Sequence, residues 1–332
     1  MRYISLLFIL LAGPVVGQTT TSKVSGPVLG YVFDSAIEGV RPIWGIPGAA
    51  TLGEPLEFGR PLAAGAVSPQ QDYVLATDRD GAVLLARLDT ETLELSAVPE
   101  ARSGAGLISL SPTGNAAALY HSGSNRIQIV TGLPGRPKLK ADVDLSVLPG
   151  TLVSLAVADR GALVVLALVG DTGTLYLFEG HGEPRYLSAA GRAASMTFLA
   201  NRDDLLLTDP AANTVSLVSN VGGAPEWTLL ATEKDGLSAP VAAELSEDKL
   251  WVAHAGDVLI LDRGGQSPVR LSCACTITGL ERLRGKSTFR ISPPSGIPMW
   301  VLDGDASAAR VVFVPRLSAV TGSSALAPEG RN

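Results

Sequence analysis

The chain has 332 residues, of which 46% are hydrophobic and only 17% are charged, so it carries enough apolar side chains for a large buried core. Aromatic residues make up 5%, and Ala, Val and Leu supply most of the apolar content. The formal net charge is −6 and no run of Lys and Arg occurs. These features exclude a basic nucleic-acid-binding surface, so we expect no nucleic-acid partner.

The first 17 residues have the pattern of a secretory signal peptide. Arg2 gives the start a positive charge, an apolar run covers residues 4–12, and small residues precede Gln18. An uncleaved membrane anchor is the alternative, but this run is shorter than the roughly 20 residues that span a bilayer. No later stretch has that length. We therefore expect export to the periplasm or the cell exterior, with no membrane span after cleavage.

The rest of the chain divides into three parts. Residues 18–27 and 321–332 are rich in small and polar side chains, which is typical of a flexible lead-in and a disordered tail. Between them, residues 28–320 form a single domain. The chain's 36 Gly and 22 Pro interrupt short apolar runs there, and helical periodicity is lacking, so the pattern favours an all-β fold.

A short apolar run that ends in a turn recurs through this domain. The clearest copies read VSPQQ, LSPTG and ISPPS, in which Pro fixes φ at a turn position. Taking the Ser before Pro as an anchor, the equivalent positions are Ser68, Ser111, Ala156, Ala200, Ser246 and Ser292. Successive anchors are 43 to 46 residues apart, and so constant a period indicates a repeated supersecondary unit.

Each unit reads as four short strands, of which the first ends at the anchor and the fourth is the most polar. Four strands in about 44 residues predict a β-propeller, with the fourth strand of each blade at the rim. Six anchored units and a partial unit at residues 28–62, which lacks a first strand, give seven blades. The last unit shows three strands, and pairing of the two chain ends would close the ring. A pair of β-sandwiches is the structural alternative.

Three segments carry a resemblance to known repeats. VSPQQDYVLA, LSPTGNAAAL and ISPPSGIPMW resemble the hydrophobic-Ser-Pro-Asp-Gly turn of secreted bacterial propellers, namely the WD40-like, YVTN-type and lactonase-like repeat families. Gln70, Thr113 and Pro294 replace the Asp of that turn, and the Tyr-Val-Thr-Asn, Trp-Asp and Gly-His signatures do not occur at the matching positions. The resemblance covers about residues 28–316. It implies the architecture, and most such propellers are binding platforms while a minority are enzymes.

Acidic and imidazole side chains recur where the predicted second strands end. They are Asp34, Asp78, His121, Asp209, His254 and Asp303. Propeller geometry would place them around one mouth of the central channel, where they could hold a divalent cation or a cationic ligand. The preference of Asp for the first position of a β-turn explains the acids without any ligand, although it does not explain the two His. A divalent cation is the one cofactor that this pattern suggests.

The two cysteines, Cys273 and Cys275, are separated by one residue. In an exported protein, an even pair favours an intrachain disulfide. Residues i and i+2 of an extended strand stand more than about 6 Å apart, near the limit for a bridge, so a bulge or turn is required. Two free thiols, or a bridge to a partner, remain as alternatives.

Catalytic motifs are lacking in the sequence. No nucleophile elbow in a strand–turn–helix context, no phosphate loop and no His-Glu-x-x-His motif occurs. We therefore expect a monomeric, non-enzymatic propeller that binds a protein or a cell-envelope component. One alternative is a metal-assisted hydrolase of the lactonase-like type, with its site at the Asp/His mouth. The other is a structural part of a larger secretion or surface assembly.

Overall fold

The computed structural model describes residues 26–90, 92–169, 173–180, 182–189, 195–254, 256–262, 267–296 and 298–317. The predicted signal peptide, most of the predicted lead-in and the predicted tail lie outside these residues. Among the described residues, no helix is both long and apolar enough to cross a membrane.

The described chain consists of strands and two single-turn 3₁₀ helices, η1 (Asp159–Gly161) and η2 (Glu233–Asp235). The first sheet has three strands: β1 (Val28–Asp34), β2 (Gly39–Trp44) and β3 (Thr51–Leu52). The second comprises β4 (Leu62–Val67), β5 (Tyr73–Asp78), β6 (Val83–Arg87) and β7 (Leu95–Ala97). The third comprises β8 (Leu107–Leu110), β9 (Ala116–His121), β10 (Arg126–Thr131) and β11 (Lys138–Asp144).

Four further four-stranded sheets follow in chain order. One contains β12 (Thr151–Val157), β13 (Leu163–Val169), β14 (Thr174–Glu179) and β15 (Arg185–Ala189). The next contains β16 (Ser195–Phe198), β17 (Leu205–Asp209), β18 (Thr214–Ser219) and β19 (Glu226–Ala231). Then come β20 (Pro240–Ser246), β21 (Lys249–His254), β22 (Asp257–Asp262) and β23 (Val269–Ser272). The last sheet contains β24 (Glu281–Arg282), β25 (Thr288–Arg290), β26 (Met299–Asp303) and β27 (Arg310–Val314).

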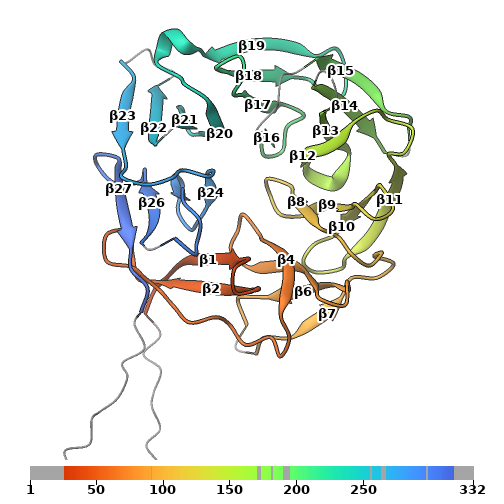
Figure 1. Ribbon diagram of the computed structural model, residues 1–332, viewed down its shortest axis with the longest axis horizontal. Coiled ribbons are helices and arrows are strands. Elements are labelled where there is room, and N and C mark those ends of the chain that lie inside the picture. The colour runs from red at the N-terminus through yellow and green to blue at the C-terminus, as the bar shows by residue number, and fades with distance from the viewer. Residues whose placement is uncertain are drawn as a thin grey trace, which may run out of the picture.

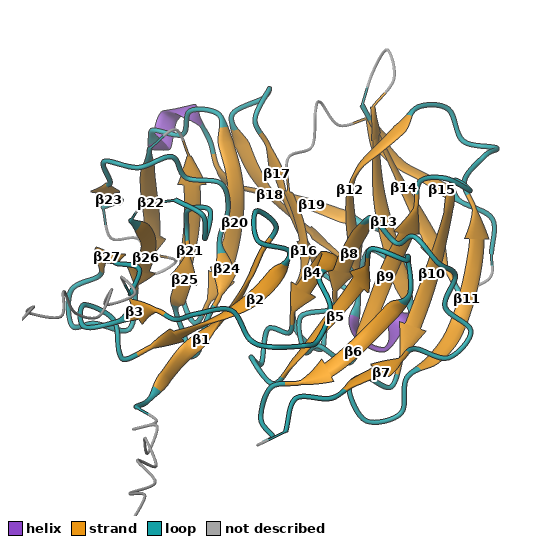
Figure 2. Cartoon of the chain, turned by 60° about the horizontal axis from the view of Figure 1, so that its bottom comes forward, coloured by secondary structure: helices purple, strands orange, loops and turns teal. Residues whose placement is uncertain are grey.

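The sheets stand side by side in a ring, which confirms the predicted all-β propeller (Figure 1). The prediction of seven blades is wrong, because the ring has six four-stranded blades, and the remaining β1–β3 sheet has only three strands. Strands within each sheet are antiparallel, and the sheets meet face to face (Figure 2). Apolar side chains fill the seams between sheets, as where Tyr73 and Leu75 of β5 pack against Ala117 and Leu119 of β9.

Burial follows position within a blade. All six residues of β5, a second strand, are buried, whereas the first four residues of β19, a fourth strand, are exposed. This difference arises because neighbouring sheets cover both faces of the inner strands, while the outer strands form the rim. The predicted apolar inner strands and polar fourth strands therefore follow from the ring geometry.

The anchor turns join the first strand of a blade to the second. The Ser68 N–H donates to the carbonyl of Tyr73, and the Ser111 N–H donates to the carbonyl of Ala116 in the same way. The fourth turn residue takes a positive φ, 61° at Gln71 and 72° at Gly114. Glycine adopts that conformation freely, which accounts for the Gly of LSPTG.

The last blade corrects the predicted strand assignment. Its innermost strand is β24, so Ser292 follows the second strand and not the first. The blade therefore has four strands, where three were predicted. The sequence concealed β24 because this two-residue strand, Glu281-Arg282, has no apolar pattern.

In the first sheet, the innermost described strand, β1, runs opposite to the innermost strand of the next sheet, β4. At the start of β4, the Leu62 N–H donates to the carbonyl of Glu38, which follows the end of β1. Beyond the end of β4, the side chain of Gln71 accepts the N–H of Tyr31, near the middle of β1. Hence β1 runs opposite to β4 and corresponds to a second strand, and among the described residues no first strand lies inside it. The fourth strand expected at the end of the predicted partial unit, residues 28–62, lies earlier, because β3 at Thr51–Leu52 takes that place.

The C-terminal end of the described chain lies at the outer side of this sheet. Leu52 pairs in parallel with Arg316. Its N–H donates to the carbonyl of Pro315 at 2.8 Å, and its carbonyl accepts from the Leu317 N–H at 3.2 Å. Residues 315–317 therefore contact the β1–β3 sheet and tie the last blade to it.

Candidate functional site

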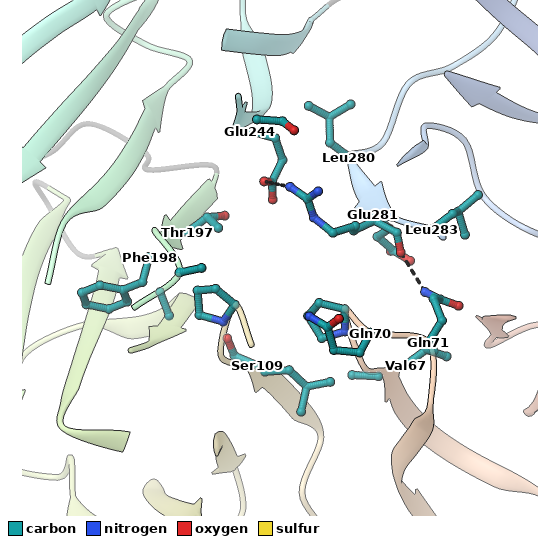
Figure 3. A pocket seen from close by; sticks show the side chains of 18 of the residues that line it. Val67, Gln70, Gln71, Ser109, Thr197, Phe198, Glu244, Leu280, Glu281 and Leu283 are labelled. Atoms are coloured by element: carbon teal, nitrogen blue, oxygen red, sulfur yellow. Dashed lines mark hydrogen bonds and ion pairs between the residues drawn. The ribbon is translucent and has the colours of Figure 1, made fainter. Parts of the chain in front are cut away.

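A cavity of about 1010 Å³ lies at the centre of the ring. Every sheet contributes to its wall through its innermost strand or the turn that follows it. Most of this wall is apolar or carries neutral polar groups, as at Val67, Ser109, Thr197, Phe198 and Leu280 (Figure 3). Such a lining is typical of a site that binds a partly apolar ligand.

Charged groups concentrate on one side of the cavity, along β20 and β24. Glu244 of β20 forms an ion pair with Arg282 of β24, with its Oε2 at 3.2 Å from Nη2 (Figure 3). Arg282 also donates to the carbonyl of Lys286 at 2.7 Å and lies over the ring of Phe289 at 5.2 Å. Burial raises the pKa of Glu244, although the guanidinium of Arg282 acts in the opposite direction.

A second ion pair, between Arg290 and Glu281, lies beside the first. Arg290, which is nearly buried, pairs with the exposed carboxylate of Glu281 and donates to the carbonyl of Ser292. Both charges on the short strand β24 thus have partners. A ligand in the cavity would meet a charged wall of fixed geometry on one side, and apolar and neutral polar groups on the others.

Gln71 joins the cavity wall where the β1–β3 sheet lacks a first strand. Its Oε1 accepts the Tyr31 N–H at 2.5 Å, and its Nε2 donates to the carbonyl of Arg282 at 2.7 Å. Arg284 stacks over the ring of Tyr31 at 5.7 Å and donates to the carbonyls of Val28 and Gln71. No local sequence pattern predicted these contacts, because the partners are 40 to 256 residues apart.

The six predicted site residues do not line this cavity. Five of them, Asp34, Asp78, His121, Asp209 and His254, end β1, β5, β9, β17 and β21. Asp303 ends the third strand of its blade. Asp303 pairs with Thr288 of β25, and the hydroxyl of the neighbouring Ser287 donates to the hydroxyl of Ser246 at the end of β20. Asp303 therefore lies at the opposite end of the ring from the other five residues.

The acidic members make local contacts. Asp78 binds Arg60 at 2.7 Å and the Ala82 N–H at 2.8 Å, and Asp209 accepts from the Ala211 and Ala212 N–H groups. Two others pair with arginines of their own sheets: Asp303 with Arg310 at 3.0 Å and Asp34 with Arg41 at 3.9 Å. The bonds from backbone N–H groups to Asp78 and Asp209 match the turn preference of Asp that was the alternative explanation, whereas the arginine pairs are additional contacts.

The two imidazoles are almost completely buried. His121 Nδ1 lies 3.2 Å from the carbonyl of Ser103, in the segment that connects the preceding sheet to β8. Burial lowers the pKa of both His121 and His254. In the described parts of the chain, no three His, Cys, Asp or Glu side chains gather closely enough to hold a metal ion. A divalent cation at the six residues stays a prediction.

A disulfide joins Cys273 and Cys275. The chain bends directly after β23, which brings the two Cα atoms to 5.2 Å, within the range that a disulfide spans. This bend is the departure from an extended strand that the one-residue spacing requires. The Cys273 N–H also donates to the carbonyl of Gly256.

No protein-family model and no curated protein sequence matches the chain. Solved structures are similar in fold. A functionally unknown protein from Desulfotomaculum acetoxidans DSM 771 has a TM-score of 0.60 at 13% identity, over 86% of this chain and 99% of that one. A catalytically inactive virginiamycin B lyase from Staphylococcus aureus, described with quinupristin, has a TM-score of 0.50 at 13% identity, over 77% and 84%. Identities this low support the propeller fold alone.

Proposed function

We propose that this protein is an exported, non-enzymatic β-propeller that binds a protein or cell-envelope component at its central cavity. The observation that carries the proposal is the cavity itself, about 1010 Å³ in volume, with apolar and neutral polar groups around most of its wall and an ion pair between β20 and β24. An apolar segment of a partner would lose water contact against Val67 and Leu110, which line the cavity and are only partly buried. The Glu244–Arg282 pair would supply hydrogen-bonding groups that set its orientation.

The matched variants Thr197→Trp and Thr228→Trp test this proposal. Thr197 lines the cavity, while Thr228 is exposed on the rim strand β19. Partners captured from an envelope extract are identified by mass spectrometry, purified and titrated directly against each variant. We expect Thr197→Trp to weaken binding at least tenfold while Thr228→Trp binds as the wild type does. Equal binding by both variants would place the ligand elsewhere and contradict the proposal.

A metal-assisted hydrolase with a divalent cation at the six predicted residues is the competing proposal, and cation binding can be measured. After treatment with a chelator, the protein is titrated with Ca²⁺, Mg²⁺, Mn²⁺ and Zn²⁺ while its thermal unfolding is followed. An ion at about 100 times its dissociation constant would stabilise the fold by roughly 2.7 kcal/mol. A rise in melting temperature that His254→Ala abolishes would favour the metal-assisted hydrolase over the binding module.

A further inference from the structure

The charged side chains that line the central cavity do not balance. Three carboxylates line it, and each forms an ion pair with a basic side chain: Glu244 with Arg282, Glu281 with Arg290, and Glu247 with Lys286. Arg284 is the remaining charged residue of the lining, and among the described residues no carboxylate pairs with it. Hydrogen bonds from Arg87 are the main cause that lowers the pKa of Asp89, and the charge of Arg284 adds only a little. The cavity therefore has one cation that no ion pair uses.

The guanidinium of Arg284 is held in place and still has donors to spare. Its Nη1 donates to the carbonyl of Val28 at 3.2 Å, and its Nη2 donates to the carbonyl of Gln71 at 3.4 Å. The group also lies over the ring of Tyr31, at 5.7 Å. Because a guanidinium has more N–H groups than these two bonds use, it can donate to an anion without giving up its present contacts.

Arg284 lies at the end of the cavity where the first strands of the blades end. The Leu283 N–H donates to the carbonyl of Thr288, which is the hydrogen bond that the anchor turn at Ser68 also makes. Leu283 therefore has the place of an anchor residue, and Arg284 has the place of Pro69, which lines the cavity as well. Because Arg284 is exposed, its guanidinium is at a mouth of the cavity and open to solvent.

Apolar side chains line the cavity next to this mouth. Val67 and Leu110 each come directly before an anchor residue, and both are only partly buried, as is Leu245 on β20. A ligand that covered them would remove apolar surface from water, which is favourable. The volume of about 1010 Å³ matches the upper end of the range for small-molecule pockets, roughly 300–1,000 Å³. The site therefore combines a cationic mouth with an apolar interior.

We propose that the central cavity binds an amphipathic small molecule, with a carboxylate head on Arg284 and an apolar body against Val67 and Leu110. The inference rests on the proposed function, and within it selects a small cell-envelope component over a protein. A guanidinium can donate two parallel N–H bonds to one carboxylate, which fixes the orientation of the head. A protein C-terminus would have to thread the whole cavity to place its carboxylate at this mouth. A free small molecule with its head at the mouth needs no second opening.

Isothermal titration with octanoate and octanamide tests the head group, because the two probes share a chain and differ in charge at pH 7. In the chain from Gln18 onward, octanoate should bind at least tenfold more tightly than octanamide. Arg284→Gln should abolish this preference by weakening octanoate alone. The control is Arg79→Gln, an exposed arginine outside the cavity, which should bind as the wild type does. Equal binding of the two probes by the wild type would overturn the proposal, as would a preference that survives in Arg284→Gln.

The comparison of the two probes on the wild type needs no variant, so it decides the question should Arg284→Gln fold poorly. Thr197→Trp separates this inference from the proposed function. If it weakens both probes and the wild type binds them equally, the cavity is a ligand site and only the carboxylate assignment fails. If octanoate does not bind up to its solubility limit, the inference is overturned, while the partner titrations with Thr197→Trp and Thr228→Trp still decide the proposed function.

Discussion

The sector from β4 to β23 and the closing sector, where β24 meets β1, are held together differently. In the first, the turn of one blade bonds to the turn of the next, as where the Tyr73 hydroxyl donates to the carbonyl of Gly114 at 2.6 Å. In the closing sector, the side chains of Gln71 and Arg284 join segments that lie 211 to 256 residues apart. The first kind of contact needs only two neighbouring repeats, whereas the second requires both ends of the ring to be folded.

This difference bears on how the ring resists opening. A repeat array in which each unit contacts only its neighbours is stabilised unit by unit. A closed ring gains further stability from the contacts that join its ends, and here those contacts involve few residues. Substitutions in the closing sector should therefore cost more stability than equivalent substitutions in the β4–β23 sector.

The largest effect is expected from Gln71→Ala. It would leave the Tyr31 N–H and the carbonyl of Arg282 without partners, at about 1–3 kcal/mol for each buried group. We expect a loss of roughly 3 kcal/mol in the free energy of unfolding, measured in urea. Ala is as strained as Gln at positive φ, so backbone strain does not confound the comparison. The exposed neighbour Gln70→Ala should change stability by less than about 0.5 kcal/mol, and a similar loss there would contradict the assignment.

The matching substitution in the β4–β23 sector is Asp159→Ala. The Asp159 carboxylate accepts the N–H and hydroxyl of Thr113 and the N–H of Asn201, so it links the turns of three consecutive blades. Because Asp159 is only partly buried, we expect a loss of about 2 kcal/mol near pH 7. If this loss exceeds that of Gln71→Ala, substitutions in the closing sector do not cost more stability than those in the β4–β23 sector.

The effect of Asp159 should also depend on pH. Burial acts to raise its pKa, but the hydrogen bonds from Asn201 and Thr113 outweigh burial and hold the pKa below its usual range. The stabilisation is therefore present above about pH 4, the pKa of Asp in an unfolded chain, and is lost as the pH falls further. Wild type and Asp159→Ala should converge in stability at low pH, and a constant difference would contradict this.

The sequence predicted the β4–β23 sector well, because local signals repeat there. Pro69 and Pro112 mark the turns, and Gly114 supplies the positive φ that the turn needs. The closing sector could not be predicted in the same way. Strand β24 has the sequence Glu-Arg, which lacks the apolar pattern of a strand. Ser292 has the Ser-Pro sequence of an anchor turn, although it follows a second strand and not a first. The central cavity was also missed, since its polar wall depends on the contact between Glu244 and Arg282, 38 residues apart.

A smaller effect is expected from the two buried histidines. Burial lowers the pKa of His121 and of His254, so the folded protein keeps both rings neutral at pH values where the unfolded chain binds protons. Stability should therefore fall as the pH drops below about 6.5, by less than about 1.4 kcal/mol per pH unit for each ring. Urea unfolding between pH 6.5 and pH 5 should show a shallower dependence in the His121→Gln/His254→Gln double variant. An unchanged slope would contradict the assignment of neutral rings.

The smallest effect is expected at the boundary between the two sectors, where the Cys273–Cys275 bridge precedes β24. A bridge across one residue closes a very short loop, so it removes little conformational freedom from the unfolded chain, worth about 1.5 kcal/mol at most. Cys273→Ala/Cys275→Ala should lower the free energy of unfolding by no more than this, and reduction of the wild-type bridge should have the same effect. A much larger loss would mean that the bridge also positions β24, in which case the closing sector would depend on a covalent constraint in addition to Gln71 and Arg284.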